Sequence, residues 1–210
     1  WRKGPEKNHD MVRLYMMLQL GYYITESSEH LSEYVPYFIK KSYPELISEF
    51  NIPLDEYPRR CVNQIAHWKA QKKQLRGKGL THTRGHEYGS WIMESVLTGQ
   101  PFALGGNVLN HGLITNLPRN ACVEVSCLVD RNGVQGTFVG DLPEQCAALN
   151  RTNINTQLLT LEAAFTGRKD HIYQAAMLDP HTSAELSIDD IRRLCDDLIR
   201  AHGRWLPRFR

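Results

Sequence analysis

The sequence lacks the features that define several protein classes. It has no run of about 18 apolar residues that could cross a membrane, and its first residues contain no apolar signal-peptide core. Lys and Arg number 25 against 23 Asp and Glu, so the formal net charge is only +2. A near-neutral balance does not favour a nucleic-acid binder. We therefore expect a globular protein with neither a membrane nor a nucleic-acid partner.

The cysteines indicate neither a disulfide framework nor a zinc ribbon. There are five of them, an odd number at irregular spacing with no CxxC pair, which favours a reducing cytoplasm. Cys122 and Cys127 are five residues apart in a predicted strand, so their thiols should face opposite sides and cannot share one metal. We interpret both as buried, inert thiols.

Motifs for binding phosphate or zinc are also missing. The glycine pair in 104–107 fits neither GxGxxG nor a Walker loop, and the position four residues after His86 is Ser90, so an HExxH motif fails. His82 and His86 are therefore expected to be surface or helix-start histidines. The cationic run 69–78 has no interleaved aromatic residues and is interpreted as an exposed linker.

Hydrophobic periodicity predicts an α+β fold, with helices packed on a small antiparallel sheet in one domain over residues 1–210. Helices are predicted at 5–20, from about 58, at 86–97, at 143–166, at 169–177 and at 187–203. Strands are predicted at 22–25, 102–109, 112–117, 121–129 and 134–139. Asn132-Gly133 suits the hairpin turn before the last strand, and Ser187 suits a helix cap.

The segment 26–38 has the composition of a site. It places three carboxylates, one histidine and two tyrosines around Pro36. A tyrosine acts as a general base only if its pKa falls well below about 10, which requires a nearby cation, metal or strong donor. The alternative is a tyrosine-rich loop that packs on the core.

Six blocks, in this order along the chain, resemble the C-terminal half of family 4 glycosidases. They are GYYITESSEHLSEYVPYFIK (21–40), PLDEYPRRC (53–61), GNVLNHGLITNLP (106–118), CVEVSCLVDRNG (122–133), ALNRTNIN (148–155) and AAMLDPHTSAELS (175–187). The resemblance covers essentially the whole chain. Within the family it is most similar to the melibiase-type α-galactosidases, with α-galacturonidases and α-glucosidases as close relatives.

This resemblance implies hydrolysis of α-galactosides that depends on NAD and Mn2+. In that family NAD oxidises the sugar at C3, a base removes the acidified C2 proton, and the glycosidic oxygen leaves by elimination before water adds and hydride returns. The metal acts as a Lewis acid on the oxidised sugar. The alternatives are α-galacturonidase or α-glucosidase activity, or a non-catalytic sugar-binding or assembly module.

The resemblance also implies roles for individual residues. Tyr34 matches the family's base, and Tyr37 is the fallback. Because His30 and Glu33 are close to it in sequence, we expect them to orient Tyr34 or to reach substrate hydroxyls.

Further predicted substrate contacts come from two other segments. Arg84, His86 and Glu87 match a block that is expected to face the active-site cleft, and Arg60 is an additional predicted sugar contact. The group Asn107, Asn110 and Gly112 is expected either to take part in the site or to shape turns.

The family's N-terminal blocks do not occur in this sequence. Its glycine-rich NAD loop and the Cys and His that hold Mn2+ are missing, so both cofactors are expected to be held mainly outside this chain. With Trp1 in place of an initiator Met, the resemblance implies a partial protein, inactive by itself. We expect a substrate-binding and oligomerisation domain of a cytoplasmic homodimer or homotetramer.

Overall fold

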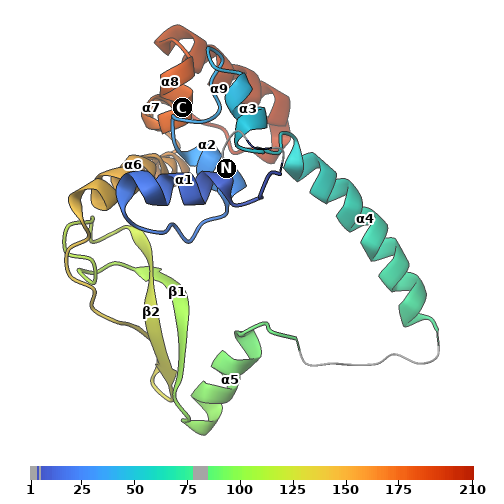
Figure 1. Ribbon diagram of the computed structural model, residues 1–210, viewed down its shortest axis with the longest axis vertical. Coiled ribbons are helices and arrows are strands. Elements are labelled where there is room, and N and C mark those ends of the chain that lie inside the picture. Colours follow the sequence, from blue (N-terminus) through green and yellow to red (C-terminus); the bar gives the residue numbers. More distant parts are fainter. Residues whose placement is uncertain (1–3, 5, 78–84) are drawn as a thin grey trace. The chain divides into compact units, whose positions relative to one another are not determined.

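The computed structural model describes residues 4, 6–77 and 85–210 (Figure 1). The helices are α1 (Met11–Leu20), α2 (Ser28–Tyr34), α3 (Glu45–Glu49), α4 (Glu56–Leu75), α5 (Gly89–Thr98), α6 (Glu144–Thr166), α7 (Lys169–Leu178), α8 (Pro180–Glu185) and α9 (Ile188–His202). The strands are β1 (Phe102–Leu109), β2 (Cys122–Asp130) and β3 (Gly133–Gly136). The predicted α+β class is confirmed.

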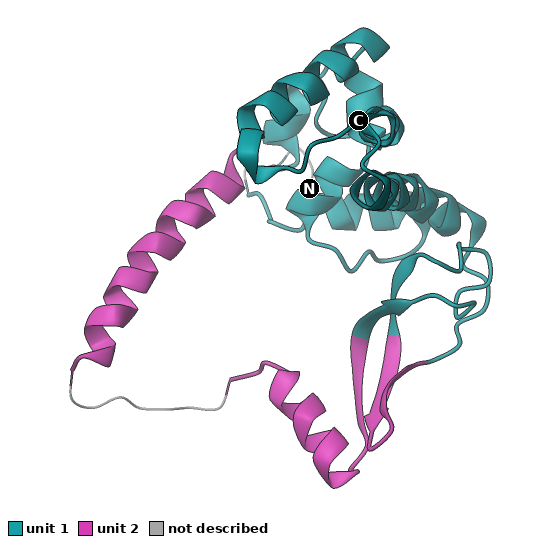
Figure 2. Ribbon diagram, turned by 180° about the vertical axis from the view of Figure 1, so that it is seen from behind, with its two compact units in different colours: residues 1–52, 106–125, 137–210 teal, residues 53–105, 126–136 magenta. Residues whose placement is uncertain are grey.

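The chain divides into two compact units (Figure 2). Unit 1 comprises residues 1–52, 106–125 and 137–210, and unit 2 comprises residues 53–105 and 126–136. Two units within a chain can belong to one domain, so the single domain over 1–210 stays a prediction.

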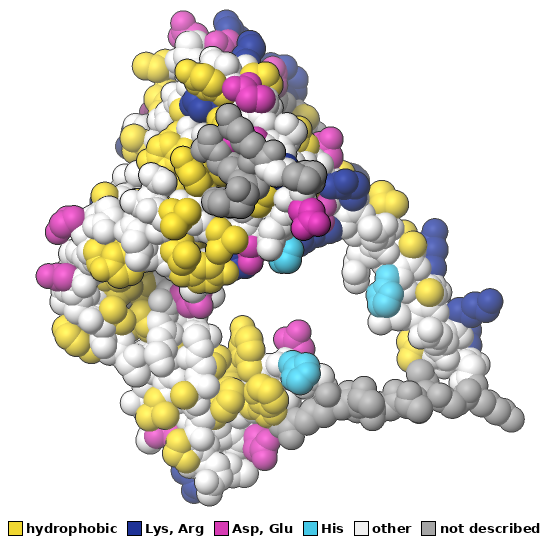
Figure 3. Space-filling view, in the orientation of Figure 1, with side chains coloured by type: hydrophobic (Ala, Val, Ile, Leu, Met, Phe, Trp, Pro, Cys, Tyr) yellow, Lys and Arg dark blue, Asp and Glu magenta, His cyan; other side chains and the backbone are white. Residues whose placement is uncertain are grey.

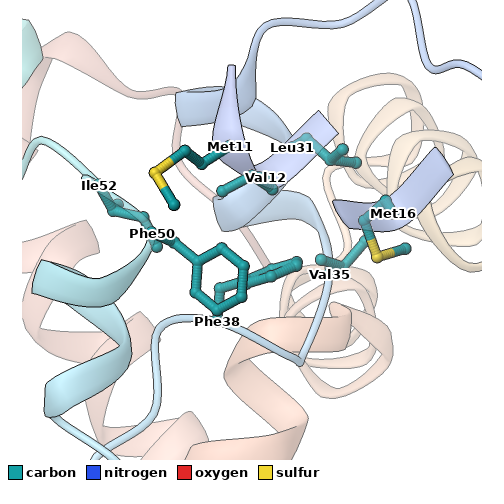
Figure 4. Close-up of a cluster of buried hydrophobic side chains, with 8 residues drawn as sticks. All are labelled: Met11, Val12, Met16, Leu31, Val35, Phe38, Phe50 and Ile52. Carbon is teal, nitrogen blue, oxygen red and sulfur yellow. The ribbon is translucent and has the colours of Figure 1, made fainter. Parts of the chain in front are cut away.

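The core of unit 1 is formed by α1, α2 and the segment that follows them (Figure 4). Met11, Val12 and Met16 project from one stripe of α1 and are at most 4% exposed. The rings of Phe38 and Phe50 meet edge to face with centroids 4.9 Å apart, a favoured aromatic geometry. This packing fixes α2 within unit 1.

The sheet has the order β1-β2-β3, with β2 and β3 antiparallel and Val129 opposite Val134. Burial alternates along β2, as the period of two predicts. Cys127 is fully buried and Cys122 is exposed, so the prediction that their thiols face opposite sides is confirmed. The interpretation of Cys122 as buried is wrong, because it occupies the solvent face of β2.

Two of the predicted strands do not form among the described residues. Residues 22–25 are irregular, because no strand lies beside them to pair with. Residues 112–117 contribute only an isolated bridge from Ile114 to Gly140. In that loop, carbonyl groups that a strand would use for pairing accept hydrogen bonds from the Asn110 side chain instead.

The cationic run is helical as far as Leu75. α4 continues through Lys69, Lys72 and Lys73 to Leu75, because lysine is a good helix former and no Gly or Pro interrupts the segment. Residues 78–84, including Lys78 and His82, lie outside the described residues. Figure 3 shows hydrophobic and cationic side chains exposed together along this helix.

Short and capped helices complete the fold. Ser187 caps α9 as predicted, since its side chain accepts a hydrogen bond from the backbone N–H of Asp190. The seven residues of α2, the five of α3 and the six of α8 were not predicted as helices. No described helix is both long enough and apolar enough to span a membrane.

Candidate functional site

Unit 1 contains a pocket of about 540 Å3. Its walls are the end of α1, the irregular segment 22–26, α2, and the first half of α6. The polar side chains of its lining include Glu26, Tyr34, Asn107, Asn150, Asn153 and Gln157. Tyr34, the predicted base, therefore lies in a pocket large enough for a sugar ring.

Local sequence explains why α2 presents Tyr34 to this pocket. Ser27 caps the helix by accepting a hydrogen bond from the backbone N–H of His30. Leu31 and Val35, one turn apart, are buried in the core. Tyr34 lies off this buried stripe, and 43% of its surface is exposed.

His30 and Glu26 form a polar pair beside Tyr34. The His30 Nδ1 atom lies 3.1 Å from Glu26 Oε1, and the His30 and Tyr34 ring centroids are 6.1 Å apart. Burial acts to raise the pKa of Glu26, but hydrogen bonds from the Ser27 N–H and from His30 outweigh it and lower that pKa. Glu26 therefore keeps a negative charge in the pocket.

The surroundings of Tyr34 keep its phenol protonated. Burial raises the pKa of Tyr34, and the negative charges of Glu26 and Glu33 raise it further. A general base needs the opposite shift. For Tyr34 to act as one, a cation, metal or strong donor must reach its phenol from outside the described surroundings.

A stripe of amide side chains on α6 also lines the pocket. Asn150, Asn153 and Gln157 follow one another at spacings of three and four, which places them on one face of the helix. The Asn153 Nδ2 group donates to the backbone carbonyl of Tyr34 at 3.3 Å. Sequence reasoning did not select these amides, although their helical spacing was a readable signal.

The structure assigns different places to the two asparagines of the β1 region. Asn107 lines the pocket. Asn110 is fully buried and shapes the loop after β1, donating to the carbonyls of Ile114, Leu117 and Pro118 and accepting from the Ile114 N–H. Gly112 shapes the same loop, since its φ of +98° suits glycine.

The other predicted site residues lie elsewhere. Arg60 is on α4 in unit 2, with its Nε 3.0 Å from Glu56 Oε1. His86 and Glu87 are exposed residues of unit 2 before α5. Arg84 lies outside the described residues. Of the predicted residues in unit 1, Glu33 and Tyr37 are exposed and Tyr34 lines the pocket.

The described residues do not by themselves fit either cofactor that the sequence resemblance implies, NAD or Mn2+. Among them no group of three or more His, Cys, Asp or Glu side chains could hold a metal ion. The glycine pair of 104–107 lies inside β1, whereas a dinucleotide loop opens a helix and presents backbone N–H groups to phosphate.

The sequence profile of the Family 4 glycosyl hydrolase C-terminal domain matches residues 1–182. The chain belongs to this glycosyl hydrolase family. This domain is 62% identical to the alpha-galactosidase of Bacillus subtilis over 99% of the chain and 48% of that protein. It is 31% identical to the alpha-galactosidase of Rhizobium meliloti, over 95% of the chain and 43% of that protein. The chain thus spans about half the length of these curated relatives.

Solved structures show the same fold for this glycosyl hydrolase domain. A Bacillus subtilis protein described as a glucosidase has a TM-score of 0.77 and 22% identity. The match covers 89% of this chain and 42% of that protein. A 6-phospho-alpha-glucosidase from gut microorganisms, in complex with NAD and glucose-6-phosphate, matches 94% of the chain and 44% of its own, with a TM-score of 0.71 and 20% identity. A 6-phospho-alpha-glucosidase structure from the same source, with NAD and Mn2+, has a TM-score of 0.61 at 16% identity. The match covers 94% of this chain and 44% of that protein.

Proposed function

We propose that the protein hydrolyses α-galactosides and that unit 1 of this chain supplies the pocket for the sugar. The observation that carries the proposal is Tyr34 in a pocket that the amide side chains of Asn107, Asn150 and Gln157 also line. Amide groups donate and accept hydrogen bonds, which suits sugar hydroxyls. The similarity to two alpha-galactosidases supports the same reading.

The charge of the lining favours a neutral sugar. Among the described residues that line the pocket, Glu26 carries the only charge. Its carboxylate would repel the carboxylate of a galacturonide or the phosphate of a sugar phosphate. The lining thus supports an α-galactoside. α-Glucosides remain the alternative substrates, because glucose differs from galactose only in the orientation of one hydroxyl group.

We further propose that Tyr34 is the base that removes a proton from the bound sugar. His30, whose ring lies beside that of Tyr34 and which pairs with Glu26, orients the phenol. NAD and Mn2+ are proposed as cofactors held by residues outside the described part of the chain, supported by their presence in structures of similar fold. Five free cysteines support a reducing cytoplasm, and a homodimer or homotetramer remains our proposal for the assembly.

The test is the Tyr34→Phe variant of the whole protein, assayed on p-nitrophenyl α-galactoside and on the matching α-galacturonide. Removing only the hydroxyl should lower turnover by about 10²- to 10⁴-fold, the usual contribution of a general base, and should abolish C2 proton exchange with solvent. Tyr43→Phe, at an exposed tyrosine that does not line the pocket, is the matched control.

Three results would contradict the proposal. Full turnover in Tyr34→Phe would remove Tyr34 as the base, and loss of turnover in Tyr37→Phe instead would move the role to the fallback residue. Faster hydrolysis of the α-galacturonide than of the α-galactoside would overturn the preference for a neutral sugar.

A second candidate function is a non-catalytic sugar-binding module. One observation favours it, namely that the described surroundings raise the pKa of Tyr34. Such a module would bind galactosides in the same pocket without hydrolysing them, and calorimetric titration with methyl α-galactoside alongside the turnover assay separates the two functions.

A further inference from the structure

The contact between Asn153 and Tyr34 joins two of the helices that line the pocket. The Asn153 Nδ2 atom lies 3.3 Å from the Tyr34 carbonyl oxygen, across 119 residues of sequence. The same Nδ2 lies 3.3 Å from Thr152 Oγ1. Asn153 is partly buried and lines the pocket.

The position of this contact matters because Tyr34 is the last residue of a short helix. α2 has seven residues, and the final carbonyl groups of a helix have no partner within it. The next residue, Val35, has an extended backbone with ψ of 153°, so the helix ends at Tyr34. A side chain from α6 thus satisfies a carbonyl that α2 leaves open.

We propose that Asn153 is a positioning residue for Tyr34, which holds the end of α2 against α6 and so fixes the direction in which the phenol enters the pocket. The inference rests on the proposed function of Tyr34 as the base. The Tyr34 backbone is then held from two sides, by Val35 buried at 1% exposure in the core and by Asn153 at the carbonyl. Its ring is held by contact with His30.

Asn150, on the same helix, has a different hydrogen-bond partner from Asn153. It lies on the same stripe of α6 and lines the same pocket, but its Nδ2 donates to the Cys146 carbonyl of its own helix, 2.8 Å away. Among the described residues it makes no hydrogen bond to α2. We therefore assign Asn150 to sugar binding and Asn153 to the placement of Tyr34.

The experiment compares Asn153→Ala and Asn153→Asp with Asn150→Ala in the whole protein. Misplacing a catalytic group by about 1 Å can cost about 10²-fold in rate. Both Asn153 variants should lower kcat and C2 proton exchange by about 10- to 100-fold, with KM changed by less than about threefold, because neither can donate as the amide does. Asn150→Ala should instead raise KM more than it lowers kcat. Asn155→Ala, on the same helix and outside the pocket lining, controls for helix stability.

A second readout does not depend on turnover. With 3-fluorotyrosine at position 34, the fluorine resonance of the chain should shift in Asn153→Ala and Asn153→Asp and stay unchanged in Asn155→Ala. An unmoved resonance together with a kcat equal to that of Asn155→Ala overturns the positioning role, even when Tyr34→Phe is inactive. Full activity of Tyr34→Phe is a separate result that overturns the base assignment, and with it the catalytic part of this inference.

Discussion

At the scale of single residues, asparagine side chains of unit 1 act in two distinct environments. Asn110 is fully buried and satisfies three carbonyls and one N–H of its own loop. Asn153 is partly exposed to the pocket and reaches another helix. Burial decides which hydrogen bonds water can replace, so the two residues should respond differently to substitution.

Replacing Asn110 by Ala should destabilise unit 1. The substitution removes the side-chain partner of the Leu117 carbonyl and of the Ile114 N–H in a buried site. The Ile114 and Pro118 carbonyls still accept from the backbone N–H groups of Leu117 and Ala121. Each buried unsatisfied group costs on the order of 1–3 kcal/mol. We expect the free energy of unfolding, measured in urea, to fall by about 3 kcal/mol.

Asn116→Ala is the matched control for this prediction. Asn116 also makes two side-chain hydrogen bonds, to the backbone N–H and carbonyl of Leu142, but it is exposed, so water can replace them. Its substitution should cost less than about 1 kcal/mol. Equal losses in the two variants would show that burial of Asn110 is not what makes it important.

The site residues differ in how well sequence reveals them. Tyr34 was found because it occupies a block that resembles a known family. Asn153 was missed because its importance lies in a contact with a residue 119 positions away. The role of Asn110 was left open, since one asparagine beside a turn can bind a ligand or shape a loop, and only its burial separates the two.

At the scale of elements, patterns carried by neighbouring residues were predictable. The alternation of β2 and the Ser187 cap of α9 depend on side chains within a few positions of one another. Residues 22–25 have the composition of a strand, but a strand also needs a partner that local sequence does not specify. The six residues of α8 are too few to show a hydrophobic period.

α8 offers a test of how pH affects contacts between elements. Glu185, its last residue, pairs with Lys40 at 3.1 Å and accepts a hydrogen bond from the Lys41 backbone N–H at 3.0 Å. The hydrogen bond from Lys41, and then Lys40, lower the pKa of Glu185. A lowered folded-state pKa adds stability above the unfolded pKa of about 4.3, and this stability is lost as pH falls through the folded value.

We therefore expect the stability difference between the wild type and Glu185→Gln to depend on pH. The wild type should have the higher urea midpoint at pH 7, and the two midpoints should converge as the pH falls below the ordinary range of a glutamate carboxyl. Glu144→Gln, at an exposed glutamate in the first turn of α6, serves as the reference substitution. A difference that is constant from pH 7 to pH 2 would show that the Glu185 contacts do not stabilise the fold through its charge.

At the scale of the whole molecule, the chain is a family 4 glycosyl hydrolase domain about half as long as its curated relatives. Its formal net charge is +2, and among the described residues that line the pocket Glu26 alone is charged. The described residues hold no cluster suited to a metal.

The proposed cofactors lead to a contrast between the chain and the whole protein. Treatment with EDTA should stop hydrolysis by the whole protein, and added Mn2+ should restore it, since the metal is proposed to stabilise charge during turnover. The thermal midpoint of this chain alone should move by less than about 1 °C on the same treatment, because a ligand stabilises only a fold that binds it. Hydrolysis that is insensitive to EDTA would refute the metal requirement.

The alternating faces of β2 have a consequence for chemical reactivity. Cys122 meets solvent on one face, so its thiolate is open to alkylating or oxidising reagents in the native state. Cys127, five residues along the same strand, is completely shielded and becomes reachable only when the sheet opens. The rate at which Cys122 reacts thus depends on the reagent in solution, whereas the rate at which Cys127 reacts depends on how often the native sheet opens.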